Sequence, residues 1–273
     1  MSGSQHSIKQ RFSEEFNLAK ELARNSGKIL LANFGKRKEL SYKGVFNLVT
    51  ESDEASERSI ISSLKRNYPN DSVLTEESQP KEADPERRWI IDPLDGTNNY
   101  AHNFPIFCVS IAFEYWGKII IGIVYNPVND EMFSAVKDSG AYLNTKMIKV
   151  SSTEKLVNSL LATGFPYDRL EGGETNIEFL SAYLMKAQGI RRTGSAALDL
   201  CFLASGRIDG YWELKLSPWD TAAGALIVKE AGGKISCLDG SEWNPFKKEI
   251  LASNSIIHDQ MIEVAKSVPR KVS

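Results

Sequence analysis

The sequence predicts a mixed α/β fold built from packed layers, and three observations support this class. Helix-like and strand-like hydrophobic patterns occur in both halves of the 273-residue chain. Apolar residues make up 42% of the composition, which is enough to bury a sizeable core. No internal repeat and no apolar run of about eighteen residues breaks the pattern, so neither a repeat array nor a membrane span is expected. Helices and strands that each bury one apolar side favour layers.

The N-terminal half is expected to begin with two helices. Apolar residues from Phe12 to Phe34 recur at helical spacing on one face, which indicates an amphipathic helix. A basic, glycine-bounded loop over residues 35–44 follows. A second helix is predicted over residues 53–66, with Ser52 or Asp53 as its cap. Short apolar runs separated by turn residues then predict strands over residues 89–91, 109–113, 119–125 and 132–136.

The C-terminal half alternates between the two kinds of element. Strands are predicted over residues 159–163, 208–212 and 233–237, and helices over residues 176–186, 195–204 and 220–231. No low-complexity linker separates the two halves. We therefore expect one unit spanning residues 1–273, with an N-terminal half of about 1–150 and a C-terminal half of about 151–273.

Composition argues against several classes of function. The formal net charge is −2, so neither a nucleic-acid partner nor an anionic membrane is expected. Three cysteines, Cys108, Cys201 and Cys237, form no C-x-x-C pair, and their odd number argues against a disulfide framework. The first residues are polar and lack the apolar core of a signal peptide. A reducing, cytoplasmic location is expected from these features.

The densest chemistry lies in the string Trp89-Ile-Ile-Asp92-Pro-Leu-Asp95-Gly-Thr97. A buried strand is expected to deliver Asp92 at its carboxyl end, where Pro93 stops the pairing and Asp95 enters a tight turn. Two carboxylates placed in this way can converge on one point, and such hard oxygen ligands suit Mg²⁺. An ordinary turn with capping aspartates is the alternative interpretation.

Two further acidic positions support the metal interpretation. Glu76 follows a short apolar run, and Asp220 opens a helix of small residues. Taken singly, Glu76 and Glu77 are typical of a solvated pair, and Asp220 is typical of a helix cap. Together with the first cluster, they supply what a two-metal phosphatase needs. Carboxylates from separate elements would clamp ions about 3.5–4 Å apart and activate a water for in-line attack.

Two predicted helix starts could bind phosphate. Small residues at Gly96-Thr97 and at Gly194-Ser195 would let a phosphate approach the free N–H groups of the first helical turn. A routine helix cap explains each of them equally well.

These motifs resemble the two signatures of the inositol monophosphatase family. Asp92-Pro-Leu-Asp95-Gly-Thr97-Asn-Asn-Tyr is similar to the first, and Trp219-Asp220-Thr-Ala-Ala-Gly, running on to Glu230-Ala-Gly-Gly233, is similar to the second. Thr75-Glu76-Glu77-Ser78 lies upstream, and Gly194-Ser-Ala-Ala197 lies between the signatures. The resemblance covers roughly Phe12 to Asn254. It implies a layered αβαβα sugar-phosphatase fold, Mg²⁺-dependent hydrolysis of a small phosphate monoester, sensitivity to Li⁺ and a homodimer.

The resemblance also implies a role for each matching residue, with two to three Mg²⁺ ions. Ligands of the first ion would be Glu76, Asp92 and the carbonyl of Leu94. Ligands of the second would be Asp92, Asp95 and Asp220, and a weaker third ion would depend on Glu76 and water. Thr97 would hydrogen-bond the nucleophilic water, which Asp53 helps to orient.

Substrate contacts are implied as well. The amides of Gly96 and Thr97 would hold the phosphate, and the organic part would meet Gly194, Ser195, Ala196, Glu213 and Asp220. Glu213 matches a carboxylate that grips sugar hydroxyls, which favours myo-inositol 1-phosphate. Fructose 1,6-bisphosphate and a 3′(2′),5′-bisphosphate nucleotide remain alternative substrates. The loop that carries Lys43 would correspond to a flap over the third metal.

Other classes fit less well. Cys201 and Arg207 have the C-x₅-R spacing of cysteine-dependent phosphatases, but Cys201 lies in an apolar helical pattern. The string from Asp92 to Asp95 is one residue longer than the D-x-D of haloacid dehalogenase-type phosphatases, which would misplace the acid. A non-catalytic binding module is disfavoured because each expected metal ligand is present.

Overall fold

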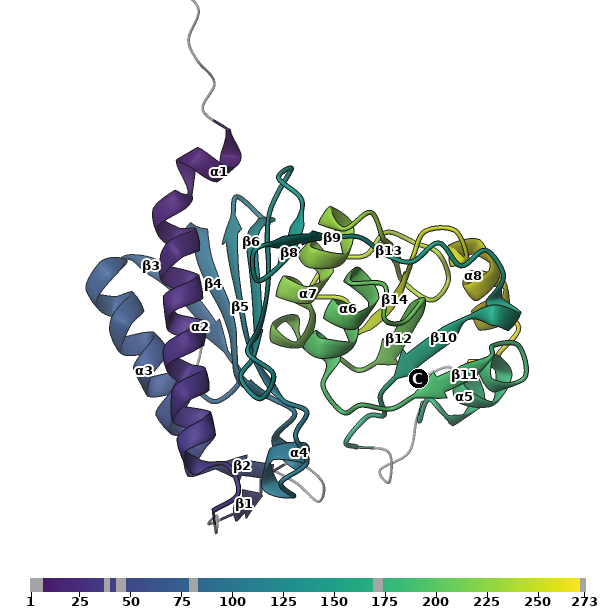
Figure 1. Cartoon of the computed structure of the whole chain (residues 1–273), viewed down its shortest axis with the longest axis horizontal. Helices are drawn as coiled ribbons and strands as arrows, with labels where there is room; N and C mark the ends of the chain where they lie inside the picture. Colours follow the sequence, from purple (N-terminus) through teal and green to yellow (C-terminus); the bar gives the residue numbers. More distant parts are fainter. Residues whose placement is uncertain (1–6, 37–39, 43–47, 79–82, 169–173, 271–273) are drawn as a thin grey trace, which may run out of the picture.

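Helices and sheets alternate in five layers (Figure 1). The computed structural model describes residues 7–36, 40–42, 48–78, 83–168 and 174–270. Lys43 and the flap assigned to it lie outside the described residues. The order of layers is helix, sheet, helix, sheet, helix, which confirms the αβαβα arrangement expected from the sequence. In the described part of the chain, no helix combines the length and apolar character needed to cross a membrane.

The first layer contains the two helices predicted near the N-terminus. A short helix α1 (Ile8–Arg11) leads into α2 (Ser13–Asn33), and α3 (Glu51–Asn67) packs beside α2. Helix α3 begins two residues earlier than predicted, so Ser52 and Asp53 lie in its first turn and do not cap it. Acidic residues in that turn favour this start because they complement the positive end of the helix dipole.

The first sheet forms the second layer. Its described strands are β3 (Asp71–Thr75), β4 (Asp84–Asp95), β5 (Cys108–Tyr115), β6 (Lys118–Asn126), β7 (Glu131–Val136), β8 (Ala141–Leu143) and β9 (Lys146–Ile148). They lie side by side in chain order, with β3 and β4 parallel and the later neighbours antiparallel. A separate antiparallel pair joins β1 (Leu40–Tyr42) to β2 (Leu48–Thr50). The four strands predicted from apolar runs are confirmed as parts of β4 to β7.

Strand β4 extends beyond the predicted run at both ends, and at its C-terminal end Pro93 interrupts the pairing without ending the strand. The ladder with β5 breaks after Asp92, which lies opposite Ser110, and resumes at Asp95, which lies opposite Cys108. Proline has no N–H to donate to a ladder, so an irregularity at this point is expected. The irregular segment carries the two aspartates singled out from the sequence.

The remaining three layers belong mostly to the C-terminal half. Helices α6 (Ala196–Ala204) and α7 (Pro218–Glu230) form the middle layer between the sheets. The second sheet has the order β11 (Gly189–Arg191), β10 (Leu160–Thr163), β12 (Gly210–Leu214), β14 (Glu249–Ser253) and β13 (Lys234–Ser236). Outside it lie α5 (Ile177–Leu184), α8 (His258–Lys266) and a 3₁₀ turn (Leu156–Asn158). The predicted elements of this half are confirmed with small shifts, whereas β11, β14 and α8 were not predicted.

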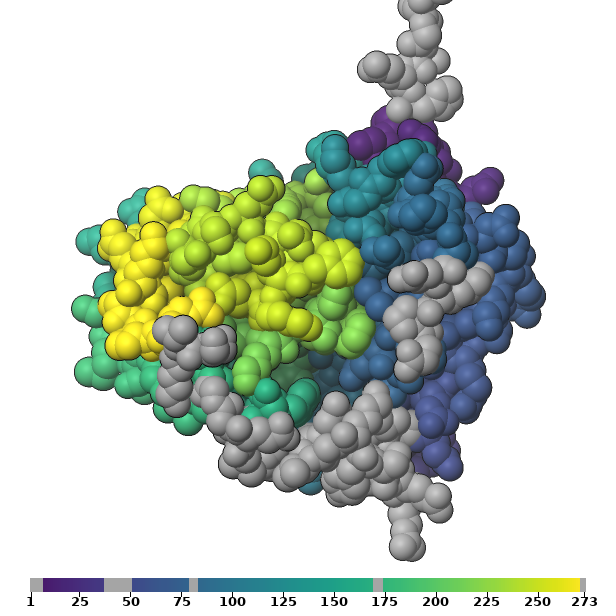
Figure 2. Space-filling view, turned by 180° about the vertical axis from the view of Figure 1, so that it is seen from behind, coloured from purple at the N-terminus to yellow at the C-terminus, as the bar shows by residue number. Residues whose placement is uncertain are grey.

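Three apolar clusters hold the layers together. One joins α2 and α3 to the outer face of the first sheet, around Trp89 and Phe113. The second fills the space between the sheets and includes the apolar side chains of α6 and α7. The third, around Tyr183 and Trp212, packs α5 and α8 against the second sheet. Figure 2 shows the two halves of the chain side by side, from purple and blue at the N-terminal half to green and yellow at the C-terminal half.

Candidate active site

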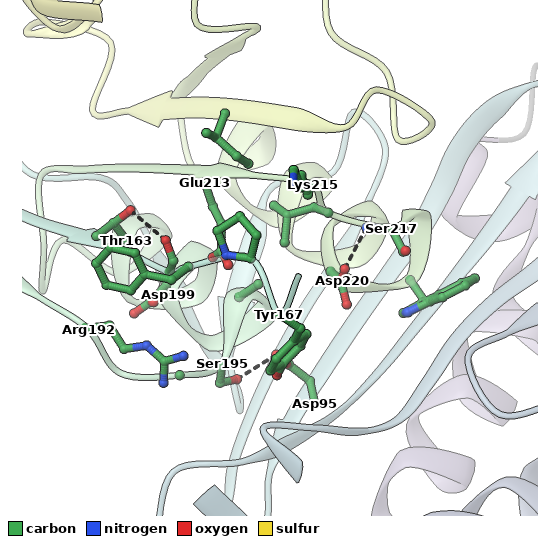
Figure 3. A pocket seen from close by; sticks show the side chains of 18 of the residues that line it. Asp95, Thr163, Tyr167, Arg192, Ser195, Asp199, Glu213, Lys215, Ser217 and Asp220 are labelled. Atoms are coloured by element: carbon green, nitrogen blue, oxygen red, sulfur yellow. Dashed lines mark hydrogen bonds between the residues drawn. The ribbon is translucent and has the colours of Figure 1, made fainter. Parts of the chain in front are cut away.

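Two adjoining cavities lie where the first sheet meets the start of α6, the start of α7 and the end of β12. The smaller has a volume of about 40 Å³ and is lined by Glu76, Asp92, Leu94, Asp95, Gly96, Thr97, Asn98, Tyr167 and Asp220. The larger, of about 250 Å³, shares Glu76, Asp95, Tyr167 and Asp220 with it and extends to Arg192, Gly194, Ser195, Ala196, Asp199, Glu213 and Lys215 (Figure 3). Except for Asp53, the site residues selected from the sequence line one or both cavities.

The parallel pairing of β3 and β4 brings the first acidic residues together. Thr75 lies opposite Ile91 in this ladder, so Glu76 and Asp92 leave the same edge of the sheet at adjacent positions. Asp92 is 1% exposed. Its Oδ1 accepts the N–H of Leu94 at 3.0 Å, a bond that lies within the irregular segment of β4.

Asp220 reaches the same place from the C-terminal half. It occupies the third position of α7, and the N–H of Ser217 donates to its Oδ2 at 2.7 Å. Asp220 is therefore the reciprocal member of a capping box. It is not the helix cap itself, which was the simplest interpretation of the sequence. Oδ1 has no hydrogen-bond partner among the described residues and belongs to the cavity wall.

Burial and mutual repulsion make these carboxylates hard to ionise. Burial raises the pKa of Asp92 well above its usual range, and the nearby charges of Glu76, Asp95 and Asp220 raise it further. Burial, followed by the charge of Asp95, raises the pKa of Asp220 to about 8. The pKa of Asp95 is also raised by burial. Hard oxygen donors that repel one another in this way fit divalent cations, which would neutralise the cluster.

A hydroxyl and a buried acid adjoin the carboxylates. The Oγ1 of Thr97 donates to Asp53 Oδ1 at 3.0 Å and lies at the same distance from the carbonyl oxygen of Leu94. Asp53 is 1% exposed and stands in the first turn of α3. Gly96 precedes Thr97 with a φ of 97°, a left-handed conformation that other residues adopt with strain. The structure thus brings Thr97 and Asp53, two residues selected from the sequence, into direct contact.

The start of α6 holds Asp95. Asp95 Oδ2 accepts the hydroxyl of Ser195 at 2.6 Å and the N–H of Ala197 at 2.8 Å. The N–H groups of this helix start were expected to be available to a phosphate, but the N–H of Ala197 is engaged by a carboxylate instead. The helix terminus thus orients Asp95 toward the cavities, while Gly194 and Ala196 line the larger one.

Glu213 closes the far side of the larger cavity. The hydroxyl of Tyr211 donates to its Oε2, and burial raises its pKa to about 7 in spite of that bond. Gly164 permits this position, because a Cβ there would lie 2.1 Å from Glu213 Oε1. Glu213 therefore lies at a fixed place in the wall of the larger cavity and does not line the smaller, acidic one.

Several residues of the cavity were not predicted. Asp199 is 1% exposed, accepts the hydroxyl of Thr193 at 2.8 Å, and has a pKa that burial raises well above its usual range. Arg192, Tyr167 and Lys215 also line the wall (Figure 3). The sequence signal that could have identified these three residues is weak. Each follows a short strand, in a segment that contains glycine, proline or serine.

Other reactive groups are engaged elsewhere. One compact group of potential metal ligands was found among the described residues, and it lies outside the candidate site. It consists of Cys237, Asp239 and Glu249, whose ligand atoms all lie within 4.8 Å of one another. Glu249 is already paired with Arg270 at 2.6 Å, so its carboxylate is engaged in an ion pair. The carboxylates of the candidate site are spread more widely.

Cysteine-based phosphatase chemistry is contradicted by the surroundings of Cys201. Its side chain is 0% exposed within α6, and burial raises the pKa of the thiol well above its usual range. Arg207 forms an ion pair with Glu131 and does not create an electropositive site for a thiolate.

Known proteins resemble this chain over nearly its whole length. The profile of the inositol monophosphatase family matches residues 12–270. An inositol-1-monophosphatase of Synechocystis sp. is 42% identical over 255 residues, 93% of this chain and 89% of the relative. A Nus factor SuhB of Haemophilus influenzae is 41% identical over 249 residues, 90% of this chain and 93% of the relative. The solved inositol monophosphatase of Anabaena (Nostoc) sp. has a TM-score of 0.86 at 40% identity, covering 95% of this chain and 98% of that one. The chain therefore belongs to the inositol monophosphatase family and is a phosphatase of that family.

Proposed function

We propose that the protein hydrolyses a small polyol phosphate monoester, myo-inositol 1-phosphate, with Mg²⁺ as its cofactor. The observation that supports this most strongly is the convergence of four repelling carboxylates on one small cavity: Glu76, Asp92, Asp95 and Asp220. A phosphate dianion would be rejected from such a place unless cations intervened. The same cavity contains Thr97, whose hydroxyl is held by Asp53.

The ligand set is proposed from the family pattern and fits the chemistry of the cavity. Two to three ions would be held: one by Glu76, Asp92 and the Leu94 carbonyl, one by Asp92, Asp95 and Asp220, and a third by Glu76 and water. When bound, Mg²⁺ supplies positive charge to the phosphate and lowers the pKa of a coordinated water. Both halves of the chain contribute ligands, so we infer that residues 1–273 act as one unit.

The protein's own groups would position the reactants. Thr97 and Asp53 would orient the attacking water, because their hydrogen bond lies at the edge of the acidic cluster. Glu76, which lines the same cavity, would assist. The amides of Gly96 and Thr97 would hold phosphate oxygens. Positioning and charge stabilisation, with no covalent intermediate, would carry the rate.

Glu213 supports the choice of a polyol. With the other wall residues of the larger cavity, Gly194, Ser195 and Ala196, it would surround the ring of the substrate, while Asp220 borders both ring and phosphate. A carboxylate fixed by Tyr211 can accept hydrogen bonds from ring hydroxyls. Such acceptors discriminate strongly, since an analogue without the hydroxyl leaves a buried group unpaired.

The substrate assignment is tested by kcat/KM values for inositol 1-phosphate, fructose 1,6-bisphosphate, a nucleoside 3′,5′-bisphosphate and an aryl phosphate, all with Mg²⁺. Glu213→Ala should lower kcat/KM for inositol 1-phosphate by about 5- to 150-fold, because a buried hydrogen bond of about 1–3 kcal/mol is lost. Aryl phosphate hydrolysis and the Mg²⁺ requirement should change little. Glu178→Ala, on the exposed side of α5, serves as the matched control.

Two results would change this assignment. Equal losses on inositol 1-phosphate and aryl phosphate would show that Glu213 supports the fold or the metals. A wild-type preference for a bisphosphate would move the substrate to another branch of the family and leave the metal chemistry in place.

We further propose, from family membership, that the protein is a cytoplasmic homodimer inhibited by Li⁺ at the ion site of Asp92, Asp95 and Asp220. Light scattering should give the mass of two chains, and rate measurements should show uncompetitive Li⁺ inhibition. A monomer mass, or full activity at high Li⁺, would contradict the respective proposal. Fractionation of the source cells would test the location.

A further inference from the structure

Tyr167 is one of four residues that line both cavities of the site. Its side chain lines both the small acidic cavity and the larger cavity that reaches Glu213. Figure 3 shows its ring on the side of the pocket where Asp95 and Asp220 lie. Tyr167 is 47% exposed, so its ring is not part of an apolar core. A substrate that places its phosphate in one cavity and its ring in the other would lie beside this side chain, as it would beside Glu76, Asp95 and Asp220.

The hydroxyl of Tyr167 has no hydrogen-bond partner among the described residues. Fully buried tyrosines of this protein do have one: Tyr100 donates to Leu30, Tyr183 to Met261, and Tyr211 to Glu213. In the small cavity the other hydroxyl, that of Thr97, is already engaged with Asp53. Tyr167 therefore offers an unused neutral donor in a cavity whose wall otherwise carries several carboxylates.

The segment that carries Tyr167 is anchored on both sides. Asn176 donates through Nδ2 to the carbonyl of Gly164, and Lys215 Nζ contacts the two carboxylate oxygens of Asp168 at 2.8 and 2.9 Å. Lys215 follows β12, the strand of Glu213, so the second anchor joins this segment to the wall of the larger cavity. Tyr167 lies between these two contacts, which connect its segment to the elements around the larger cavity.

We propose that Tyr167 is a substrate-contact residue, whose hydroxyl donates a hydrogen bond to a phosphate oxygen and whose ring packs against the carbon skeleton of the polyol. This inference rests on the proposed function and adds to it a contact that spans both parts of the substrate. A hydrogen bond to an anionic phosphate is charge-assisted and stronger than one between neutral groups. The ring offers the apolar C–H face of a cyclitol a flat surface that excludes water.

Two substitutions separate the hydroxyl from the ring. Tyr167→Phe should lower kcat/KM about 10- to 100-fold for inositol 1-phosphate and for aryl phosphate alike, because both present the same phosphate. Calorimetry with inorganic phosphate and Mg²⁺ should show weaker phosphate binding by a similar factor. Tyr167→Ala should add a further loss for inositol 1-phosphate. The Mg²⁺ concentration for half-maximal activity should stay unchanged in both variants. Tyr142→Phe, in strand β8, is the control for removal of a hydroxyl elsewhere.

The outcomes distinguish this inference from the proposed function. If wild-type protein hydrolyses inositol 1-phosphate while Tyr167→Phe retains full kcat/KM and phosphate affinity, the contact is wrong and the function stands. If the variant loses Mg²⁺ affinity in proportion to its activity, Tyr167 supports the metal cluster and the contact is again wrong. If wild-type protein neither binds phosphate nor hydrolyses the ester, the proposed function itself fails. Reduced phosphate affinity with unchanged Mg²⁺ dependence is the result that supports the contact.

Discussion

Replacing Asp92 or Asp220 with asparagine is expected to reduce kcat by at least about a hundred-fold in saturating Mg²⁺, with the fold retained. Each residue is proposed to hold a cation that stabilises several kcal/mol of transition-state charge, and about 1.4 kcal/mol corresponds to a factor of ten in rate. An amide keeps the size of the side chain and one oxygen ligand but loses the negative charge. Steady-state kinetics, with circular dichroism as a check on folding, would measure the effect.

A matched control is available on the surface. Asp259 has a side chain that is 84% exposed and pairs with Lys234 on the outside of the molecule, so Asp259→Asn should keep wild-type kcat. Near wild-type turnover of Asp92→Asn or Asp220→Asn would remove that residue from the proposed ligand set. A loss of fold in both variants would shift the test to the conservative change to glutamate.

Stability in EDTA should depend strongly on pH, and Asp220 should account for part of that dependence. Its folded-state pKa is raised to about 8, whereas an unfolded aspartate titrates near 3.9. The folded state therefore binds the proton more tightly, and its stability falls as pH rises from about 4 to about 8. Asp220→Asn removes this ionisation, so the variant should melt at a higher temperature than wild type at pH 8 in EDTA.

Mg²⁺ should reverse the order of the two melting temperatures, so that the wild type melts above Asp220→Asn. Bound cations neutralise the carboxylates and stabilise the folded wild type by mass action, whereas the variant binds them more weakly. Thermal unfolding with and without Mg²⁺, at roughly pH 6 and pH 8, would measure both effects. The proposed repulsion within the cluster would be contradicted if the wild type melted above Asp220→Asn in EDTA at pH 8. It would also be contradicted if Mg²⁺ left the melting temperature of the wild type unchanged.

Much of the fold could be predicted where hydrophobic patterns are long. Helix α2 and strands β5 to β7 follow from their apolar periodicity or from continuous apolar runs. Strand β11 has three residues, and α8 has a short apolar face formed by residues such as Met261 and Val264, so neither gave a comparable signal. Their formation depends on packing against the second sheet, which is a long-range effect.

The residues of the candidate site that lie in recognisable sequence motifs could be predicted. Asp92 and Asp220 stand out because strand ends and helix starts concentrate polar ligands. The hydrogen bonds from Ser195 and Ala197 to Asp95 could not be foreseen, since they join residues about a hundred positions apart. Tyr167 was missed because an aromatic residue after a proline has no distinctive pattern until its loop is placed beside the cavity.

Removal and return of Mg²⁺ tests the central claim most directly. Phosphatase activity should disappear in EDTA and return when Mg²⁺ is added in excess, because the carboxylate cluster cannot accept a phosphate dianion without cations. Iodoacetamide should leave the activity largely intact, since Cys108, Cys201 and Cys237 are buried. Full activity in EDTA, together with inactivation by iodoacetamide, would contradict the metal mechanism and place the chemistry on a cysteine.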